Sequence, residues 1–121
     1  MGTGSLEEFT KHKYLNLETY RKNGHPVTTP VWFMIDGNLI YVVTASNTGK
    51  VKRLRNNSAV RIMPSSFRGE PKGKWTEGKA RLVEGSEAER AIELRKTKYG
   101  MQARLVGMIR GSSAVIAIEI A

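Results

Sequence analysis

The sequence contains no cysteine and only two histidines, His12 and His25. Without cysteine, the chain can form neither a disulfide framework nor a thiolate metal site, and it has no thiol nucleophile. Neither histidine lies in a pattern typical of a catalytic triad, and no His-x-x-x-His pair or acidic cluster offers metal ligands. We therefore expect no catalytic side chain and no metal site, so any redox chemistry would belong to a bound cofactor.

Long apolar runs are also missing. No segment approaches the roughly 20 apolar residues that span a bilayer, and residues 1–5 do not lead into the apolar region of a signal peptide. A reducing compartment suits a chain without cysteine, so we expect a cytoplasmic protein with no membrane span. With 121 residues, of which 40% are apolar, the chain is predicted to form a single domain over residues 1–121.

Acidic residues are absent from a long central interval. Between Asp36 and Glu70 there is no Asp or Glu, whereas six cations fall there: Lys50, Lys52, Arg53, Arg55, Arg61 and Arg68. The whole chain has 20 Lys and Arg against 11 Asp and Glu, a net charge of +9. Anionic partners are therefore expected, and nucleic acid, anionic lipid and a phosphorylated small molecule all satisfy this charge.

The segment 48–57 within this interval is predicted to be a phosphate-binding turn followed by a short helix. Gly49 directly after Thr48 allows a tight turn, and the free N–H groups at the start of a helix favour an anion. Val51 and Leu54 would face inward. The cations Lys50, Lys52, Arg53 and Arg55 would then fan around the helix start. The alternative interpretation is a solvated basic helix.

The remaining patterns predict a mainly β fold with short flanking helices and six or so antiparallel strands. Strands are expected at 14–21, 26–35, 38–44, 59–63, 75–83 and 114–120, with Pro64 ending the fourth. Turn residues at 22–25 and 36–37 would join the first three strands into a meander, and 65–74 would form a loop. Capping boxes that begin at Ser5 and Ser86 predict helices at 6–13 and 86–99, and 101–109 offers another helical segment.

The sequence has two tryptophans, Trp32 and Trp75. A planar aromatic side chain can stack on a cofactor ring or form a wall beside it. Ordinary core packing is an equally good explanation for each of them.

Several of these motifs together resemble the split β-barrel flavin and deazaflavin oxidoreductases, which are related to the pyridoxamine-phosphate oxidases. The resemblance rests on four segments: 23–33 (NGHPVTTPVWF), Asp36-Gly37, 41–44 (YVVT) and 49–57 (GKVKRLRNN). It covers essentially the whole chain and implies an FMN-binding split β-barrel. It also implies a homodimer with two cofactor sites at the subunit interface.

The resemblance further implies a set of cofactor-binding residues. Thr29, Pro30, Val31 and Trp32 would line the cofactor ring, with Trp75 a further candidate beside it. Thr44 and Ser46 would approach the ribityl chain. Thr48, Gly49 and Lys50, at the start of a helix that continues through Val51, would hold phosphate. Lys52, Arg53 and Arg55 are further candidates for the phosphate or for the rest of the cofactor.

Two departures separate this chain from the pyridoxamine-phosphate oxidases themselves. Those enzymes have arginine where Thr29 stands and an Arg-Lys pair where Gly49-Lys50 stands. The segment 49–54 instead resembles the small deazaflavin branch, whose coenzyme F420 carries a phosphate and an acidic oligoglutamate tail. An acidic tail suits a groove of lysine and arginine.

We therefore expect an F420-dependent oxidoreductase that transfers a hydride to or from an unidentified small organic substrate. One alternative is an FMN-binding protein of the same fold, whether or not it is an enzyme. A non-catalytic cofactor carrier and a basic nucleic-acid-binding module are two more. The 7% aromatic content and the lack of a recognised nucleic-acid-binding signature argue against the nucleic-acid-binding module.

Overall fold

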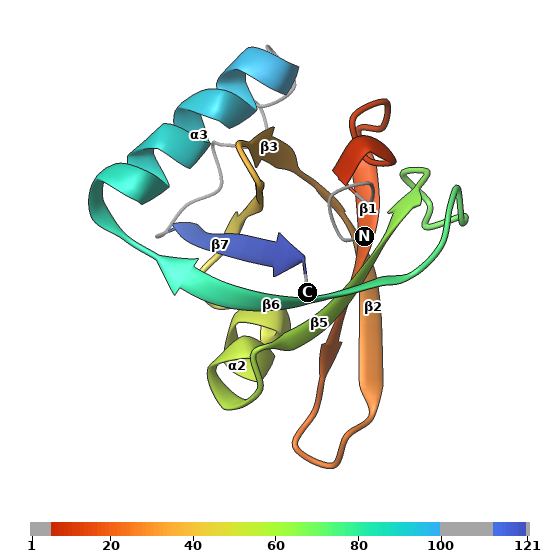
Figure 1. Ribbon diagram of the computed structural model, residues 1–121. Coiled ribbons are helices and arrows are strands. Elements are labelled where there is room, and N and C mark those ends of the chain that lie inside the picture. The colour runs from red at the N-terminus through yellow and green to blue at the C-terminus, as the bar shows by residue number, and fades with distance from the viewer. Residues whose placement is uncertain (1–5, 100–112, 121) are drawn as a thin grey trace.

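Seven antiparallel strands form one curled sheet with two short helices beside it, as the computed structural model shows (Figure 1). The structure describes residues 6–99 and 113–120. In sequence the strands are β1 (Tyr14–Tyr20), β2 (Pro26–Trp32), β3 (Met34–Asp36), β4 (Leu39–Ala45), β5 (Ala59–Ser65), β6 (Thr76–Val83) and β7 (Ser113–Ile120). Their order in the sheet is β2-β1-β5-β6-β7-β4-β3. The prediction of a mainly β split barrel is confirmed.

The two predicted tight turns form as expected. The β1–β2 turn is closed by a hydrogen bond from the Arg21 amide to the His25 carbonyl at 2.9 Å, and Gly24 takes a φ of 88°. Gly37, between β3 and β4, has a φ of 64°. Residues with a side chain rarely adopt such angles, so glycine fixes the position of both turns.

The predicted single strand at 26–35 is wrong, because the chain breaks at Phe33. β2 pairs with β1, whereas β3 pairs with β4 at the other end of the strand order, so the first three strands are not a meander. Phe33 is fully buried and packs edge-on against Phe9, with ring centroids 5.9 Å apart. Its amide and carbonyl bond to the Tyr99 hydroxyl at 3.0 and 2.7 Å. A residue 66 positions away thus supplies the partners that a continuous strand would have found in the sheet.

Pro64 does not end β5, contrary to the prediction, but lies inside it opposite Leu15. The pairing of β5 with β6 ends at Ile62, so no second strand needs a donor from Pro64. The Pro64 carbonyl accepts a hydrogen bond from the Lys72 amide at 2.8 Å instead. The predicted loop follows this strand.

The helices predicted after Thr48 and at 86–99 both form, as α2 (Gly49–Asn56) and α3 (Gly85–Tyr99). The helix predicted at 6–13 is shorter in the described chain, with only Leu6 and Glu7 helical. Turn-like hydrogen bonds follow, such as that from the Phe9 amide to the Leu6 carbonyl at 3.0 Å, and they direct Phe9 into the core. The helical segment predicted at 101–109 lies outside the described residues.

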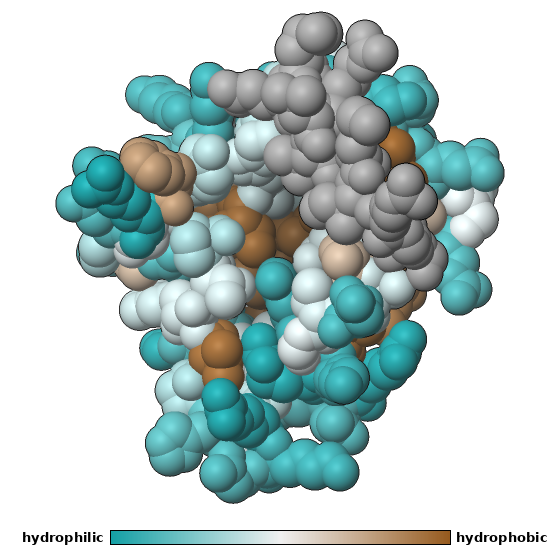
Figure 2. All heavy atoms as spheres, turned by 180° about the vertical axis from the view of Figure 1, so that it is seen from behind, coloured by the Kyte–Doolittle hydropathy of each residue, from teal (hydrophilic) through white to brown (hydrophobic). Residues whose placement is uncertain are grey.

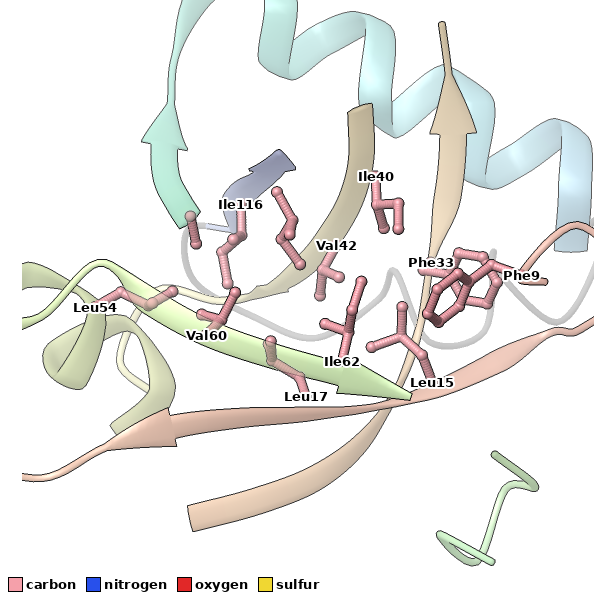
Figure 3. Packing of buried hydrophobic residues seen from close by; sticks show 12 residues of the cluster. Phe9, Leu15, Leu17, Phe33, Ile40, Val42, Leu54, Val60, Ile62 and Ile116 are labelled. Atoms are coloured by element: carbon pink, nitrogen blue, oxygen red, sulfur yellow. The ribbon is translucent and has the colours of Figure 1, made fainter. Parts of the chain in front are cut away.

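The main hydrophobic core lies inside the curl of the sheet (Figure 3). Side chains of β1 and β5 face those of β4 and β7 across it, and Leu54 of α2 closes one end. The labelled members are Phe9, Leu15, Leu17, Phe33, Ile40, Val42, Leu54, Val60, Ile62 and Ile116. A second cluster, which includes Tyr41, Ala91 and Val115, lies between the sheet and α3. Each face of the β4–β7 region is therefore covered.

Seen from behind, the molecule is divided by polarity (Figure 2). Hydrophobic atoms line a hollow near the middle of this face, whereas the lower end is strongly hydrophilic. Figure 1 places α2 and the β1–β2 turn at that lower end. Within the described residues, no helix has both the length and the apolar character needed to cross a bilayer.

Candidate anion and cofactor site

Helix α2 is fixed to the sheet by its apolar side and presents its cations outward. Val51 and Leu54 are 1% and 6% exposed, as the sequence pattern predicted, and α2 packs against β1 and β6. Because Val51 is buried, only its backbone remains to meet a ligand. Lys52 and Arg55 are exposed, three residues apart on one side of the helix, whereas Lys50 and Arg53 are partly buried on another.

The cations of α2 are not neutralised by acids. Among the described residues, no Asp or Glu lies within 4 Å of the side-chain nitrogens of Lys50, Lys52, Arg53 or Arg55. The first turn of the helix contains no acidic residue either. The positive end of the helix dipole therefore adds to uncompensated side-chain charge.

Burial makes this charge costly for the folded protein. The pKa of Lys50 is lowered by burial and further by the charge of Arg53. The pKa of Arg53 is lowered by burial and then by the charge of Arg21. Three cations that disfavour one another, with no acid among them, would be relieved by a bound anion.

Arg53 lies across the beginning of its own helix. Its Nε donates to Thr19 Oγ1 on β1 at 2.6 Å, and Thr19 is 1% exposed. A Cβ at position 49 would lie 2.7 Å from one terminal guanidinium nitrogen of Arg53, so glycine leaves the room that this arrangement uses. A larger residue at position 49 would therefore displace the end of the Arg53 side chain.

Thr48 supplies a polar atom that this structure leaves unused. It stands at the N-cap of α2, but its side chain makes no capping hydrogen bond. Its Oγ1 is buried and has no hydrogen-bond partner among the described residues. An oxygen acceptor or donor of a ligand would satisfy it. Thr48, Gly49 and Lys50 therefore offer the hydroxyl, backbone N–H and ammonium donors that suit a phosphate group.

The residues predicted to line a cofactor ring lie on β2, at the edge of the sheet. Side chains alternate along a strand, so Thr29 and Val31 lie on one face and Pro30 and Trp32 on the other. Val31 packs against the main core. The four side chains therefore cannot all contact one side of a ring, although β2 has no strand beyond it among residues 6–99 and 113–120 and so offers backbone groups at its outer edge.

Trp32 already has an aromatic neighbour. Its ring stacks on that of Tyr99 in α3, with centroids 4.3 Å apart and planes 6° from parallel. The Tyr99 hydroxyl lies 2.6 Å from the Lys13 carbonyl and 2.7 Å from that of Phe33, so the two oxygens share its one proton, and burial raises the pKa of Tyr99 to about 12. One face of Trp32 is consequently occupied within this chain.

Trp75 lies away from the basic turn. The guanidinium carbon of Arg61 is 4.7 Å from its ring centroid, and Arg61 pairs with Glu18 of β1 at 2.7 Å. The pKa of Glu18 is lowered chiefly by its hydrogen bond with Arg61. Glu18 thus neutralises Arg61, which is one of the cations between Asp36 and Glu70, and Trp75 packs on Arg61.

Thr44 and Ser46, predicted to approach the ribityl chain, lie directly before the basic turn in sequence. Thr44, near the end of β4, pairs with Ala114 of β7, and both Thr44 and Ser46 are partly buried. β4 also contacts β2, although the two strands are not hydrogen-bonded. The predicted ribityl and phosphate residues follow one another closely in sequence, and the strand that contains Thr44 contacts the predicted ring strand β2.

Sequence reasoning missed Arg21, Thr19 and Tyr99. The first two reach α2 only because β1 packs against that helix, and Tyr99 reaches Phe33 across 66 residues. No local signal marks such contacts. The alternation along β2, in contrast, could have separated Thr29 and Val31 from Pro30 and Trp32 before the structure was known.

The sequence matches the family model of pyridoxamine 5'-phosphate oxidase over residues 3–121. The chain belongs to this family. No curated protein matches the sequence.

Solved structures show the same fold at low sequence identity. HutZ, the heme storage protein from Vibrio cholerae, is 16% identical with a TM-score of 0.77, and the match covers 98% of this chain and 89% of HutZ. The conserved hypothetical protein Rv2991 from Mycobacterium tuberculosis is 20% identical with a TM-score of 0.75, and the match covers 99% of this chain and 81% of Rv2991. The F420-H2-dependent reductase FDR-A is 17% identical with a TM-score of 0.68, and the match covers 88% of this chain and 94% of FDR-A. At these identities the likeness concerns the fold.

Proposed function

We propose that this protein is an oxidoreductase that binds coenzyme F420 and transfers a hydride to or from a small organic substrate. The observation that carries the proposal is the partly buried, acid-free group of cations at the beginning of α2. Family membership supplies the cofactor class, and the F420-H2-dependent reductase among the structures of the same fold favours the deazaflavin.

The chain's own residues would bind and orient the cofactor. Thr48, Gly49 and Lys50 would hold the phosphate, and Thr44 and Ser46 would approach the ribityl chain. Lys52, Arg53 and Arg55 would serve the phosphate or the acidic tail. The ring would lie along β2 at Thr29 to Trp32, with Trp75 the least favoured contact because it packs on Arg61.

When bound, the deazaflavin supplies a ring carbon that accepts or donates a hydride. The protein's contribution is position and charge. The edge of β2 would hold the ring in one orientation, and the cations of α2 would fix the far end of the cofactor.

We also propose that the protein is a cytoplasmic homodimer. β2 stands at an edge of the sheet, with no strand beyond it among residues 6–99 and 113–120, and a second subunit would cover that edge. Sedimentation equilibrium at micromolar concentration should give twice 13.5 kDa. A 13.5 kDa species would contradict the dimer.

FMN is the second candidate, because it shares the tricyclic ring and ribityl phosphate but has no oligoglutamate tail. The same residues of the basic turn would hold its phosphate. The charge of α2 would also suit a non-catalytic cofactor carrier or a nucleic-acid-binding module.

Parallel titrations test the proposal. Purified protein would be titrated with F420, FMN and haem at low and high salt, followed by cofactor fluorescence and, for haem, by absorbance. We expect F420 to bind more tightly than FMN, with an advantage that shrinks as salt screens its tail. Equal affinities and equal salt responses would favour FMN, and tight binding of haem alone would reject both.

A further inference from the structure

The turn between β1 and β2 places a cation next to the basic beginning of α2. Arg21 directly follows β1, and its backbone amide closes the turn through the His25 carbonyl at 2.9 Å. Arg21 is separated from Lys50 and Arg53 by about 30 residues of sequence, yet Figure 1 shows this turn and α2 at the same end of the molecule. The nearness arises from the packing of α2 on β1.

Contacts between α2 and β1 fix the direction in which Arg53 points. Arg53 Nε donates to Thr19 Oγ1 at 2.6 Å, so its guanidinium reaches the side of β1 on which Thr19 lies. Side chains two residues apart on a strand share a face, so the next position on that side is Arg21. Thr19 therefore links the helix to the end of β1, directly before the turn that begins at Arg21.

The acid of β1, Glu18, is paired with other residues. Glu18 lies on the opposite face from Thr19, where it accepts hydrogen bonds from Arg61 at 2.7 Å and from Tyr20 at 2.9 Å. No carboxylate among residues 6–99 and 113–120 forms an ion pair with Arg21, Lys50 or Arg53. The fold has separated three cations from every available counter-charge.

We propose that Arg21, Lys50 and Arg53 form one anion-binding site for a ligand with two or more negative groups. For the cofactor named under Proposed function, on which this part rests, the acidic tail would leave the phosphate towards the β1–β2 turn. Lys52 and Arg55, on another side of α2, then contribute less to tail binding than Arg21.

The mutual repulsion of these cations agrees with this assignment. The charge of Arg21 contributes to lowering the pKa of Arg53, and that of Arg53 to lowering the pKa of Lys50. Arg53 is thus repelled both by Arg21 of the turn and by Lys50 at the start of the helix. A ligand with one negative group could neutralise only part of this charge.

Tripolyphosphate is the probe that tests the site without any cofactor. Its affinity would be measured by calorimetry for the native protein, for Arg21→Gln and for the matched control Lys22→Gln, which removes a neighbouring exposed charge from the same turn. We expect Arg21→Gln to weaken binding about tenfold or more, the loss of one charge-assisted contact, and Lys22→Gln to change it less than about threefold. Equal losses in the two variants would overturn the proposal.

Arg21→Lys guards against a purely structural effect. It keeps the charge and should restore most of the affinity lost in Arg21→Gln, while thermal melting without ligand shows that all three variants remain folded. Failure of Arg21→Lys to restore binding would also count against an electrostatic role.

F420 preparations with short and long glutamate tails form the second arm. Arg21→Gln should reduce affinity for the long-tailed form more than Lys52→Gln does. If F420 does not bind but tripolyphosphate behaves as expected, the proposed function fails and the anion site stands. If F420 binds and Arg21→Gln matches Lys22→Gln in both arms, the anion site fails and the proposed function stands.

Discussion

Helices α2 and α3 each carry four cations, but they differ in how many of these cations pair with acids. Two of the four cations of α3 pair with acids, Arg90 with Asp36 at 2.9 Å and Lys96 with Glu93 at 3.5 Å, whereas the buried Nε of Arg95 has no hydrogen-bond partner among the described residues. Lys98 donates to the Phe33 carbonyl at 2.9 Å. On α2, none of the four cations has an acidic partner among the described residues. The sequences already differ in this respect, because α3 contains Glu87, Glu89 and Glu93 whereas α2 contains no acid.

The comparison indicates how the pairing of a helix's cations relates to the role of that helix. Arg90 and Lys98 of α3 contact Asp36 and the Phe33 carbonyl, so these two contacts help to hold the helix on the sheet. The cations of α2 are held apart from acids while Lys50 is partly buried, which costs stability that an external anion would restore. A helix of the first kind is structural, and one of the second kind is suited to binding.

The largest effect is expected for Lys50→Ala, which tests whether α2 binds the cofactor. Loss of a charge-assisted phosphate contact should weaken cofactor binding by about 1.5–3 kcal/mol, whereas Lys11→Ala, an exposed charge far from α2, should change it little. Fluorescence titrations of the two variants measure the difference. Coincident curves would mean that α2 is only a solvated basic helix.

Tyr99→Phe tests the structural role of α3. The substitution keeps the ring that stacks on Trp32 but removes the hydroxyl that contacts the Phe33 amide and the Phe33 and Lys13 carbonyls; of these three groups, the Phe33 carbonyl keeps Lys98 as a donor. We expect the free energy of unfolding to fall by about 2 kcal/mol, because buried backbone groups lose their bonds. Urea denaturation would measure it. A change below about 0.5 kcal/mol would show that the corner at Phe33 holds without α3.

A smaller effect is expected when Lys52 and Arg55 are both replaced by Gln. These exposed cations should contribute to the preference for F420 over FMN by only about two- to fivefold, and the contribution should vanish at high salt. FMN affinity should change much less. Titrations with both cofactors at two salt concentrations give the ratio. A larger loss than that of Arg21→Gln would place the tail on this side of α2.

The smallest effect is expected for the change in the protein's stability with pH that arises from Lys98 of α3. Burial lowers the pKa of Lys98 from 10.5 to about 8, its ammonium lying 3.7 Å from the centroid of the Phe33 ring. Between these two values the unfolded chain binds more protons than the folded one, so stability should rise as the pH increases above about 8. The rise should be modest, because much of Lys98 is exposed.

Lys98→Met supplies the control for that measurement. Thermal melting of the native protein and the variant would be compared from about pH 7 towards pH 10. The rise should be absent from the variant, and equal pH profiles would contradict the assignment to Lys98.

Local patterns predicted most of the elements but not how they join. Glycines 24 and 37 fixed two turns, and Val51 with Leu54 fixed the buried side of α2. The break at Phe33 was missed because its cause, the Tyr99 hydroxyl, lies 66 residues away. The Pro64 error had a similar origin: proline is tolerated there because β6 stops earlier, at the pair Ile62–Thr76.

The candidate site was predictable to the same degree. The basic turn could be identified because its residues are consecutive in sequence. Arg21 was missed because only the packing of α2 on β1 brings it there. Trp75 was proposed as a ring neighbour from its residue type, and the structure adds that Arg61 lies over one face of its ring. Residue type predicts what a side chain can do, and long-range contacts decide what it meets.

The central position of the last strand constrains how the protein can be made. β7 lies between β6 and β4, so the β3–β4 hairpin has no hydrogen-bonded connection to the other strands until residues 113–120 are in place. During synthesis, those residues leave the ribosome after everything else described here, and the edges of β4 and β6 remain unpaired until then. Completion of the sheet is therefore a late, long-range step. Pulse-labelled hydrogen exchange should show the amides of β4 and β7 gaining protection together, after those of the β1–β2 hairpin.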